Sequence, residues 1–328
     1  MRKKIIEKLL TNSSSFEDLA LEIYAYQSVH NPVYNRFLTL SGQLRKTISK
    51  IEDIPFLPIS FFKNHEIKTG NWKISSFYTS SGTTGSTPSI HYVRDQEFYL
   101  NNAQRIFEKQ YGKLPTLNIF ALLPGYLERS NSSLVAMTKD FIDKTRSPLS
   151  GFYLHDFDKL RSVLLQAKKT ERKCLLLGVS FGLMDFAEAY QIDLSHCIIM
   201  ETGGMKGRRK EVVREELHQI LKKSFNVSSI HSEYGMTELF SQAYSRGQGI
   251  YRPGKTMRVL LREINDPFVL APFGKTGLIN VIDLANIDSC SFIATDDIGR
   301  LAKDHQFEVL GRYDQSDVRG CNLMVSDL

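Results

Sequence analysis

The 328-residue chain has few cysteines, one tryptophan and no long uncharged apolar run. Its four cysteines, Cys174, Cys197, Cys290 and Cys321, are scattered, with no CxxC pair and no spacing typical of a disulfide framework. This pattern favours a reducing, cytoplasmic setting. No apolar stretch is long enough to cross a bilayer, so we expect no membrane span. The histidines show no paired spacing of the kind that predicts a zinc site.

Charge of one sign is not concentrated anywhere in the sequence. Charged residues make up 24% of the chain and hydrophobic residues 42%, with a net charge of +6, so the composition is that of a folded protein with a sizeable core. Basic residues are spread along the chain without interleaved aromatics, and we therefore expect no nucleic-acid partner. The mild positive excess is compatible with an anionic substrate such as a nucleotide.

The hydrophobic pattern changes twice along the chain. Residues 1–50 place apolar side chains at three- and four-residue steps, which predicts helices. Residues 51–250 alternate short apolar runs with amphipathic segments, which is typical of βα units and a largely parallel sheet. Residues 251–328 contain short strands separated by turns. We predict an α/β fold with mostly parallel sheets flanked by helices and a smaller β-rich lobe at the C-terminal end, with these three segments as its units.

A small polar loop, TSSGTTGSTP at residues 79–88, lies between two predicted strands. Its glycines can adopt backbone angles that other residues avoid, so several N–H groups and hydroxyls can face one point and hold a phosphate oxygen. The loop is not a Walker motif, because it contains no GxxxxGK[ST] pattern. A flexible Ser/Gly surface loop is the alternative interpretation.

Two further segments follow predicted strands: TGG at residues 202–204 and YGMTE at residues 234–238. Ligands bind at the carboxyl ends of strands in open α/β sheets. Glu238 can hold Mg²⁺, Thr237 can contact phosphate, and Tyr234 can stack on a base. Glycines at the first segment would let the backbone pass close to a planar ring. A surface carboxylate is the alternative for Glu238.

The C-terminal third supplies two more candidate residues. Asp297, in the sequence TDD followed by GR, can accept hydrogen bonds from both hydroxyls of a ribose. Arg312 offers a planar fork of donors for ribose or phosphate oxygens. The alternatives are a turn aspartate satisfied by its own backbone and an arginine in a surface salt bridge.

Taken in order, these segments resemble the adenylate-forming superfamily of acyl- and aryl-CoA synthetases over roughly residues 50–321. The resemblance implies that ATP and Mg²⁺ are used to convert a carboxylic acid to an acyl adenylate. It assigns the ATP phosphates to the first loop, the adenine to the TGG and YGMTE segments, the catalytic phosphate and Mg²⁺ contacts to Thr237 and Glu238, and the ribose to Asp297 and Arg312. The implied nucleotide contacts are Thr79, Ser80, Ser81, Gly82, Thr83, Thr84, Gly203, Gly204, Tyr234, Gly235, Asp297 and Arg312.

Two departures from the superfamily pattern affect the expected reaction. The usual lysine after the loop proline is absent, since Pro88 is followed by Ser89 and Ile90. The chain also ends seven residues after Cys321, so the superfamily's C-terminal lid domain is expected to be absent. Ordinary CoA ligation is therefore not the expected reaction.

The tail GRYDQSDVRGCNLM, at residues 311–324, resembles the end of the acyl-protein synthetase (LuxE) family. That resemblance implies transfer of a fatty acyl group from acyl-AMP to Cys321 and then to a partner such as a reductase or carrier protein. A thiol is a good nucleophile toward an acyl adenylate, and Arg319 nearby would favour its thiolate. Alternatives are an acyl- or aryl-CoA ligase that borrows its lid or acceptor from another chain, and a nucleotide-binding scaffold that has lost the chemistry.

Overall fold

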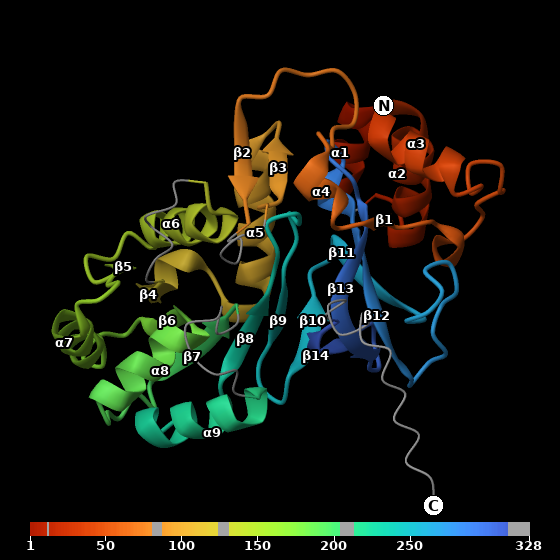
Figure 1. Cartoon of the computed structure of the whole chain (residues 1–328). Coiled ribbons are helices and arrows are strands. Elements are labelled where there is room, and N and C mark those ends of the chain that lie inside the picture. Colours follow the sequence, from red (N-terminus) through yellow and green to blue (C-terminus); the bar gives the residue numbers. More distant parts are fainter. Residues whose placement is uncertain (12, 81–86, 124–130, 204–212, 314–328) are drawn as a thin grey trace, which may run out of the picture.

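The computed structural model describes residues 1–11, 13–80, 87–123, 131–203 and 213–313. In this part of the chain one 12-stranded mixed sheet runs through the molecule, and a separate two-stranded hairpin packs beside it. The strand order is β11-β12-β13-β14-β10-β9-β8-β7-β6-β4-β5, and β1 pairs with β13 outside this path. Figure 1 shows two halves, with the N-terminal helices beside the C-terminal strands. The predicted α/β class is confirmed.

The central segment forms the parallel half of the sheet. Its strands are rich in Leu, Ile, Val and Cys, as is typical of parallel strands covered on both faces. The adjacent pairs β5–β4, β4–β6, β6–β7 and β7–β8 are all parallel. The strands of this half are β4 (Leu117–Leu122), β5 (Gly151–Phe152), β6 (Lys173–Val179), β7 (Cys197–Thr202) and β8 (His231–Tyr234).

Helices cover both faces of the parallel half. Side chains of the strands pack into two separate hydrophobic clusters, one for each group of helices. One cluster includes residues of α5 and α6, and the other includes residues of α7, α8 and α9. Helix starts follow from side-chain caps: Asp95 accepts from the Phe98 N–H at 2.9 Å and Ser132 from the Val135 N–H at 3.4 Å. The helices are α5 (Gln96–Tyr111), α6 (Ser133–Thr145), α7 (Phe157–Ala167), α8 (Ser180–Ala189) and α9 (Arg214–Phe225), with a 3₁₀ turn at Leu114–Thr116.

The C-terminal strands continue the same sheet with antiparallel pairing. β9 pairs with β8, and β10, β14, β13, β12 and β11 follow in that order. The long strand β13 was not predicted from the sequence, where a turn at Asp297 was the alternative to a ribose contact. The strands are β9 (Ala243–Ser245), β10 (Ile250–Pro253), β11 (Met257–Arg262), β12 (Thr276–Asp283), β13 (Phe292–Leu301) and β14 (Phe307–Arg312), with a 3₁₀ turn at Leu284–Asn286.

The N-terminal helices pack against these antiparallel strands. Ile5, Ile23 and Tyr34 share one hydrophobic core with Val281 and Phe292. The predicted segments 1–50 and 251–328 thus share a common core. The predicted boundaries at residues 50 and 250 stay predictions. The elements before the parallel half are α1 (Arg2–Thr11), α2 (Phe16–His30), α3 (Pro32–Leu40), a 3₁₀ turn at Ile51–Asp53, β1 (Leu57–Pro58), α4 (Phe61–Asn64) and the hairpin β2 (Ser76–Thr79) with β3 (Ile90–Val93).

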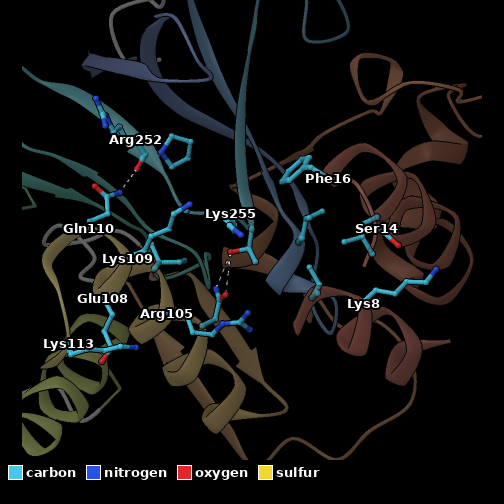
Figure 2. Close-up of a pocket in the computed structure, with 18 of the residues that line it drawn as sticks. Lys8, Ser14, Phe16, Arg105, Glu108, Lys109, Gln110, Lys113, Arg252 and Lys255 are labelled. Atoms are coloured by element: carbon cyan, nitrogen blue, oxygen red, sulfur yellow. Dashed lines mark hydrogen bonds and ion pairs between the residues drawn. The ribbon is translucent and has the colours of Figure 1, made fainter. Parts of the chain in front are cut away.

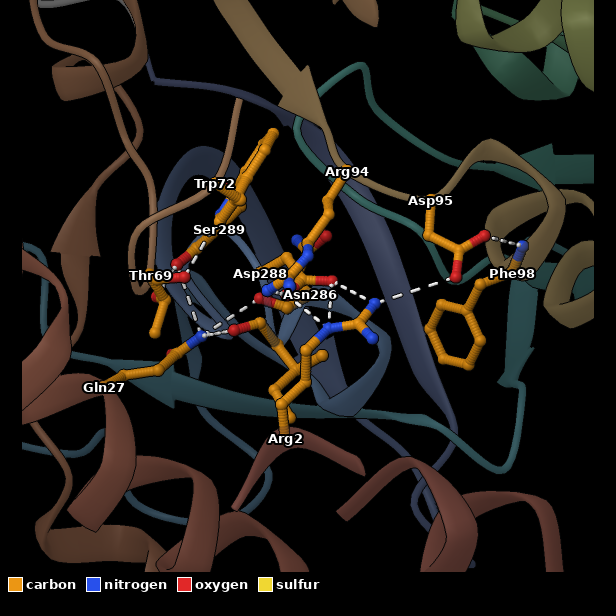
Figure 3. Close-up of polar contacts among 11 residues, drawn as sticks. Arg2, Gln27, Thr69, Trp72, Arg94, Asp95, Phe98, Asn286, Asp288 and Ser289 are labelled. Atoms are coloured by element: carbon orange, nitrogen blue, oxygen red, sulfur yellow. Dashed lines mark hydrogen bonds and ion pairs between the residues drawn. The ribbon is translucent and has the colours of Figure 1, made fainter. Parts of the chain in front are cut away.

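Polar contacts fix the same junction (Figure 3). The Arg2 guanidinium donates to both carboxylate oxygens of Asp288 at 2.6–2.9 Å, and the Gln27 amide donates to the carbonyls of Asn286, Ile287 and Ser289. The Asn286 side chain in turn donates to the backbone oxygen of Glu238 at 2.7 Å. Through these contacts the N-terminal helices support the segment that carries Glu238, a predicted site residue.

No helix in the described residues has the length and hydrophobicity needed to cross a membrane.

Candidate active site

The base of the β2–β3 hairpin lies against the segment that follows β8. The Ser80 N–H donates to the Ser89 carbonyl at 3.1 Å, and the Ser89 N–H donates to the Ser80 hydroxyl at 2.8 Å, which closes the polar loop at its base. Ser89 also hydrogen-bonds the Glu238 side chain. The His91 Nδ1 lies 2.8 Å from the Thr237 carbonyl, so this imidazole nitrogen carries the proton. Two segments that are 150 residues apart in sequence are thereby placed side by side.

Glu238 is buried, with 5% of its surface exposed, which excludes the interpretation as a surface carboxylate. Burial raises the pKa of its carboxyl, while the hydrogen bond with Ser89 and the charge of Arg312 oppose the shift and the charge of Asp297 adds to it. Glu238 thus lies within electrostatic range of both predicted ribose contacts. A buried carboxylate without a full cationic partner is a suitable place for a divalent cation.

Asp297 and Arg312 are directly opposite each other on the antiparallel strands β13 and β14. The Tyr234 hydroxyl, at the end of β8, donates to Asp297 Oδ2 at 2.9 Å. Burial raises the pKa of Asp297, and the Tyr234 hydrogen bond and Arg312 charge oppose that rise. Asp297 lies within a strand, so the turn interpretation is wrong. The Arg312 side chain is 71% exposed, and its nearest carboxylate oxygen in the described residues, on Asp296, is 4.0 Å away.

The Tyr234 ring is mostly buried. It makes edge contacts with Tyr251 and Phe307, with ring centroids 5.8 and 5.3 Å apart, and only 8% of the residue is exposed. Its hydroxyl orients Asp297, a role that the sequence analysis did not assign. Stacking of this ring on a base stays a prediction.

Gly203 directly follows β7 and lies in the left-handed region, with φ +64°, where a glycine is favoured. The Ser180 hydroxyl donates to its carbonyl at 2.6 Å and fixes the end of the strand. Gly203 therefore leaves the sheet at the same edge as Tyr234 on the adjacent strand β8, as predicted from strand ends.

A buried glutamate beneath this edge was missed by the sequence analysis. Glu233 accepts a 2.5 Å hydrogen bond from the Thr202 hydroxyl, and burial raises the pKa of its carboxyl to about 7. A Cβ atom on Gly235 would lie 2.4 Å from Glu233 Oε1, so glycine leaves the space that this side chain occupies. The only signal in the sequence was a carboxylate directly before the YGMTE segment, in the polar strand HSEY.

Several predicted site residues lie outside the described residues, so the structure says nothing about their positions. Thr79, Ser80, Gly203, Tyr234, Gly235, Thr237, Glu238, Asp297 and Arg312 are described, and the links above connect most of them around one edge of the sheet. The remaining predicted residues are Ser81, Gly82, Thr83, Thr84, Gly204 and Cys321.

A different set of soft ligands lies at the opposite edge. The ligand atoms of Cys174, His196 and Cys197 lie within 4.8 Å of one another, although their sequence spacing predicts no metal site. Cys174 and Cys197 are paired residues at the starts of β6 and β7, and a hydrogen bond between the thiols lowers the pKa of Cys174. A structural zinc site has four protein ligands, and the described residues bring three together here. The two thiols are buried at the strand starts, away from Glu238, which follows the end of β8.

Comparison with known proteins decides the family. The family model described as "Acyl-protein synthetase, LuxE" matches residues 130–328, which is more than half of the chain. The chain belongs to the LuxE family of acyl-protein synthetases. It is therefore an enzyme of the ligase or synthetase class. The long-chain-fatty-acid–luciferin-component ligase of Vibrio harveyi is 22% identical over 340 residues, covering 92% of this chain and 85% of the relative.

Solved structures show the same fold in adenylate-forming enzymes. An open conformation of 2-hydroxyisobutyryl-CoA ligase with 2-HIB-AMP and CoA is 13% identical, with a TM-score of 0.62, over 90% of this chain and 73% of that one. ATP-bound MatB from Rhodopseudomonas palustris is also 13% identical, with a TM-score of 0.55 over 74% of this chain. This chain spans about half the length of the MatB structures. These likenesses confirm the fold expected from the resemblance.

Proposed function

We propose that this LuxE-family enzyme activates a carboxylic acid, most simply a fatty acid, with ATP and then carries the acyl group on Cys321. The observation that supports this most directly is the convergence of Glu238, Asp297 and Arg312 around one edge of the sheet, next to the base of the polar loop. The relative from Vibrio harveyi is named for a fatty-acid ligase, which favours a fatty acyl substrate.

In the first step a carboxylate oxygen of the substrate attacks the α-phosphorus of ATP. The bond between the α-phosphorus and the bridging oxygen breaks, and pyrophosphate leaves with the electron pair, giving acyl-AMP. Asp297 would accept hydrogen bonds from ribose hydroxyls, held in place by the Tyr234 hydroxyl at 2.9 Å. The exposed Arg312 fork would donate to ribose or phosphate oxygens from the opposite strand position.

Mg²⁺ fits the donors at this site. Glu238 offers a buried carboxylate and Thr237 a hydroxyl, both hard oxygen ligands of the kind that Mg²⁺ prefers. When bound there, the ion would neutralise charge on the ATP phosphates. The hairpin contacts from Ser89 and His91 hold this segment at the mouth of the polar loop, whose backbone N–H groups and hydroxyls would take up the remaining phosphate charge.

In the second step the Cys321 thiolate attacks the acyl carbon, a thioester bond forms, and AMP leaves with the electrons of the broken acyl–oxygen bond. Cys321 is outside the described residues but inside the family match. The acyl group then passes to an acceptor, for which we propose a reductase or carrier protein. The proposed setting is cytoplasmic, since the cysteine pattern favours a reducing compartment.

Mass spectrometry after incubation with ATP, Mg²⁺ and fatty acids of graded length tests both steps. We expect one acyl adduct on the C-terminal peptide, absent in Cys321→Ser, while pyrophosphate exchange persists in that variant. Cys290→Ser is the matched control, because Cys290 is fully buried and should not alter the adduct. An adduct that survives in Cys321→Ser contradicts the thioester step. Pyrophosphate exchange that requires no carboxylic acid contradicts adenylation.

A further inference from the structure

A basic pocket of about 830 Å³ is lined by none of the candidate-site residues (Figure 2). The second half of α5, the β10–β11 connection and the helices α1 and α2 line it. Pro253, in its lining, pairs with Ala243, which in turn pairs with Tyr234 at the end of β8. The pocket therefore lies near the predicted nucleotide site but shares no lining residue with it.

The charge in this pocket is unbalanced. Seven of the lining side chains are cationic and only Glu108 is a carboxylate. Lys113 is paired with Glu108 at 2.7 Å and Lys8 with Glu22 at 2.6 Å. In the described residues no carboxylate lies within ion-pair distance of the other five, which are Arg105, Lys109, Arg246, Arg252 and Lys255.

The floor of the pocket is hydrogen-bonded and mostly uncharged. Asn102 is 7% exposed, and its amide donates to the Phe240 carbonyl at 3.0 Å and to the hydroxyls of Ser241 and Thr256 at 3.3 Å. Buried apolar residues such as Ile106 and Leu284 complete it. A ligand would thus meet cations at the rim and an uncharged surface below, in a volume typical of small-molecule sites.

We propose that this pocket is a second anion site, distinct from the nucleotide site, that binds a small organic molecule carrying two or more phosphate groups. Five cations without a carboxylate partner in the described residues match a ligand of several negative charges. The three arginines among them each donate to one protein oxygen, on Leu10, Gln110 and Gln306, and their other guanidinium N–H groups suit phosphate oxygens. A nucleic acid fits less well, because bases need aromatic platforms. Phe16 is the one aromatic lining residue, and the Arg258 guanidinium already covers its ring at 4.3 Å.

Calorimetric titration with inorganic tripolyphosphate, with citrate as a carboxylate of comparable charge, tests this site. We expect the double variant Lys109→Glu/Lys255→Glu to weaken tripolyphosphate binding by at least about tenfold, because two attractive charges become repulsive. Both lysines are exposed, so folding should be retained. Lys73→Glu/Lys169→Glu makes the same change in net charge at exposed lysines outside the pocket and should alter binding less than about twofold. Binding should also persist in Arg312→Ala, which alters only the predicted nucleotide site.

Lysine acetylation followed by mass spectrometry gives an independent readout on the wild-type chain. Tripolyphosphate should slow acetylation of Lys109 and Lys255 and leave Lys73 and Lys169 unchanged. The proposal is overturned if tripolyphosphate does not bind the wild-type chain, if both double variants lose binding equally, or if citrate binds as tightly. Unchanged acetylation of the pocket lysines at saturating tripolyphosphate would also overturn it.

Discussion

The parallel and antiparallel halves of the sheet contribute to the candidate site in different ways. The parallel half supplies Gly203, Tyr234 and Glu238 at or just after strand ends, where the backbone leaves the sheet. The antiparallel half supplies Asp297 and Arg312 from strand residues that are paired across the ladder. The position of a residue at a strand end is set by the conformation of the loop that follows. The position of a residue within a paired strand is set by the register of the strand pairing. A one-residue slip would turn Asp297 to the other face of the sheet.

Glu238 gives the largest expected effect and tests the strand-end contribution. Glu238→Gln keeps the volume of the side chain but removes the charge proposed to hold Mg²⁺, so acid-dependent pyrophosphate exchange should fall about a thousandfold, or about 4 kcal/mol. Glu263→Gln, at an exposed glutamate, is the control and should retain exchange. Normal exchange in Glu238→Gln, with an unchanged melting temperature in both variants, would remove Glu238 from the metal site.

Glu233 tests the buried layer beneath the same strand ends. Its folded pKa of about 7 lies above the ordinary value of 4.5, so the folded state binds more protons than the unfolded state between these pH values. The free energy of unfolding should therefore fall as pH rises from 4.5 to 7, by on the order of 3 kcal/mol. Urea unfolding across this range measures the slope, which should become shallower in Glu233→Gln. Equal slopes in the two proteins would show that Glu233 titrates as an ordinary carboxyl.

Asp297 tests the strand-paired contribution. Asp297→Asn removes the negative charge and replaces one of the two acceptor oxygens proposed for the ribose hydroxyls with an NH2 donor, so the KM for ATP should rise about tenfold to a hundredfold. Asp296→Asn is the neighbouring control: its side chain is 37% exposed, and adjacent strand residues point to opposite faces. A larger effect at Asp296 than at Asp297 would mean that the ligand binds the other face of β13.

The sequence predicted the parallel half better than the antiparallel half for a physical reason. Apolar runs bounded by turns mark buried strands, and such a run, Cys197–Met200, lies just before the TGG segment. In contrast, no strand was predicted at Thr295, Asp296 and Asp297, because consecutive polar residues give no apolar alternation that would mark a strand. Pairing with Arg312, and packing of Ile5 and Ile23 on the distant strands, depend on contacts that are far apart in sequence.

The same limit applies within the candidate site. Short motifs singled out Glu238 as a candidate residue, and the structure shows it buried, but they did not predict that Ser89 and His91 would bind the segment around it. They also did not predict the buried Glu233, because its environment is created by Thr202 on the neighbouring strand. Burial and partner identity follow from tertiary packing, which local spacing does not encode.

Tyr234 joins the two halves, and its effect should be the smallest. Tyr234→Phe keeps the ring between Tyr251 and Phe307 but removes the hydroxyl that donates to Asp297. Losing one hydrogen bond to a carboxylate should raise the KM for ATP by about threefold to tenfold, with kcat nearly unchanged. In the Asp297→Asn background the same substitution should add little, because the two residues act through one hydrogen bond. Additive effects in that double-mutant cycle would mean that Tyr234 contacts the nucleotide independently of Asp297.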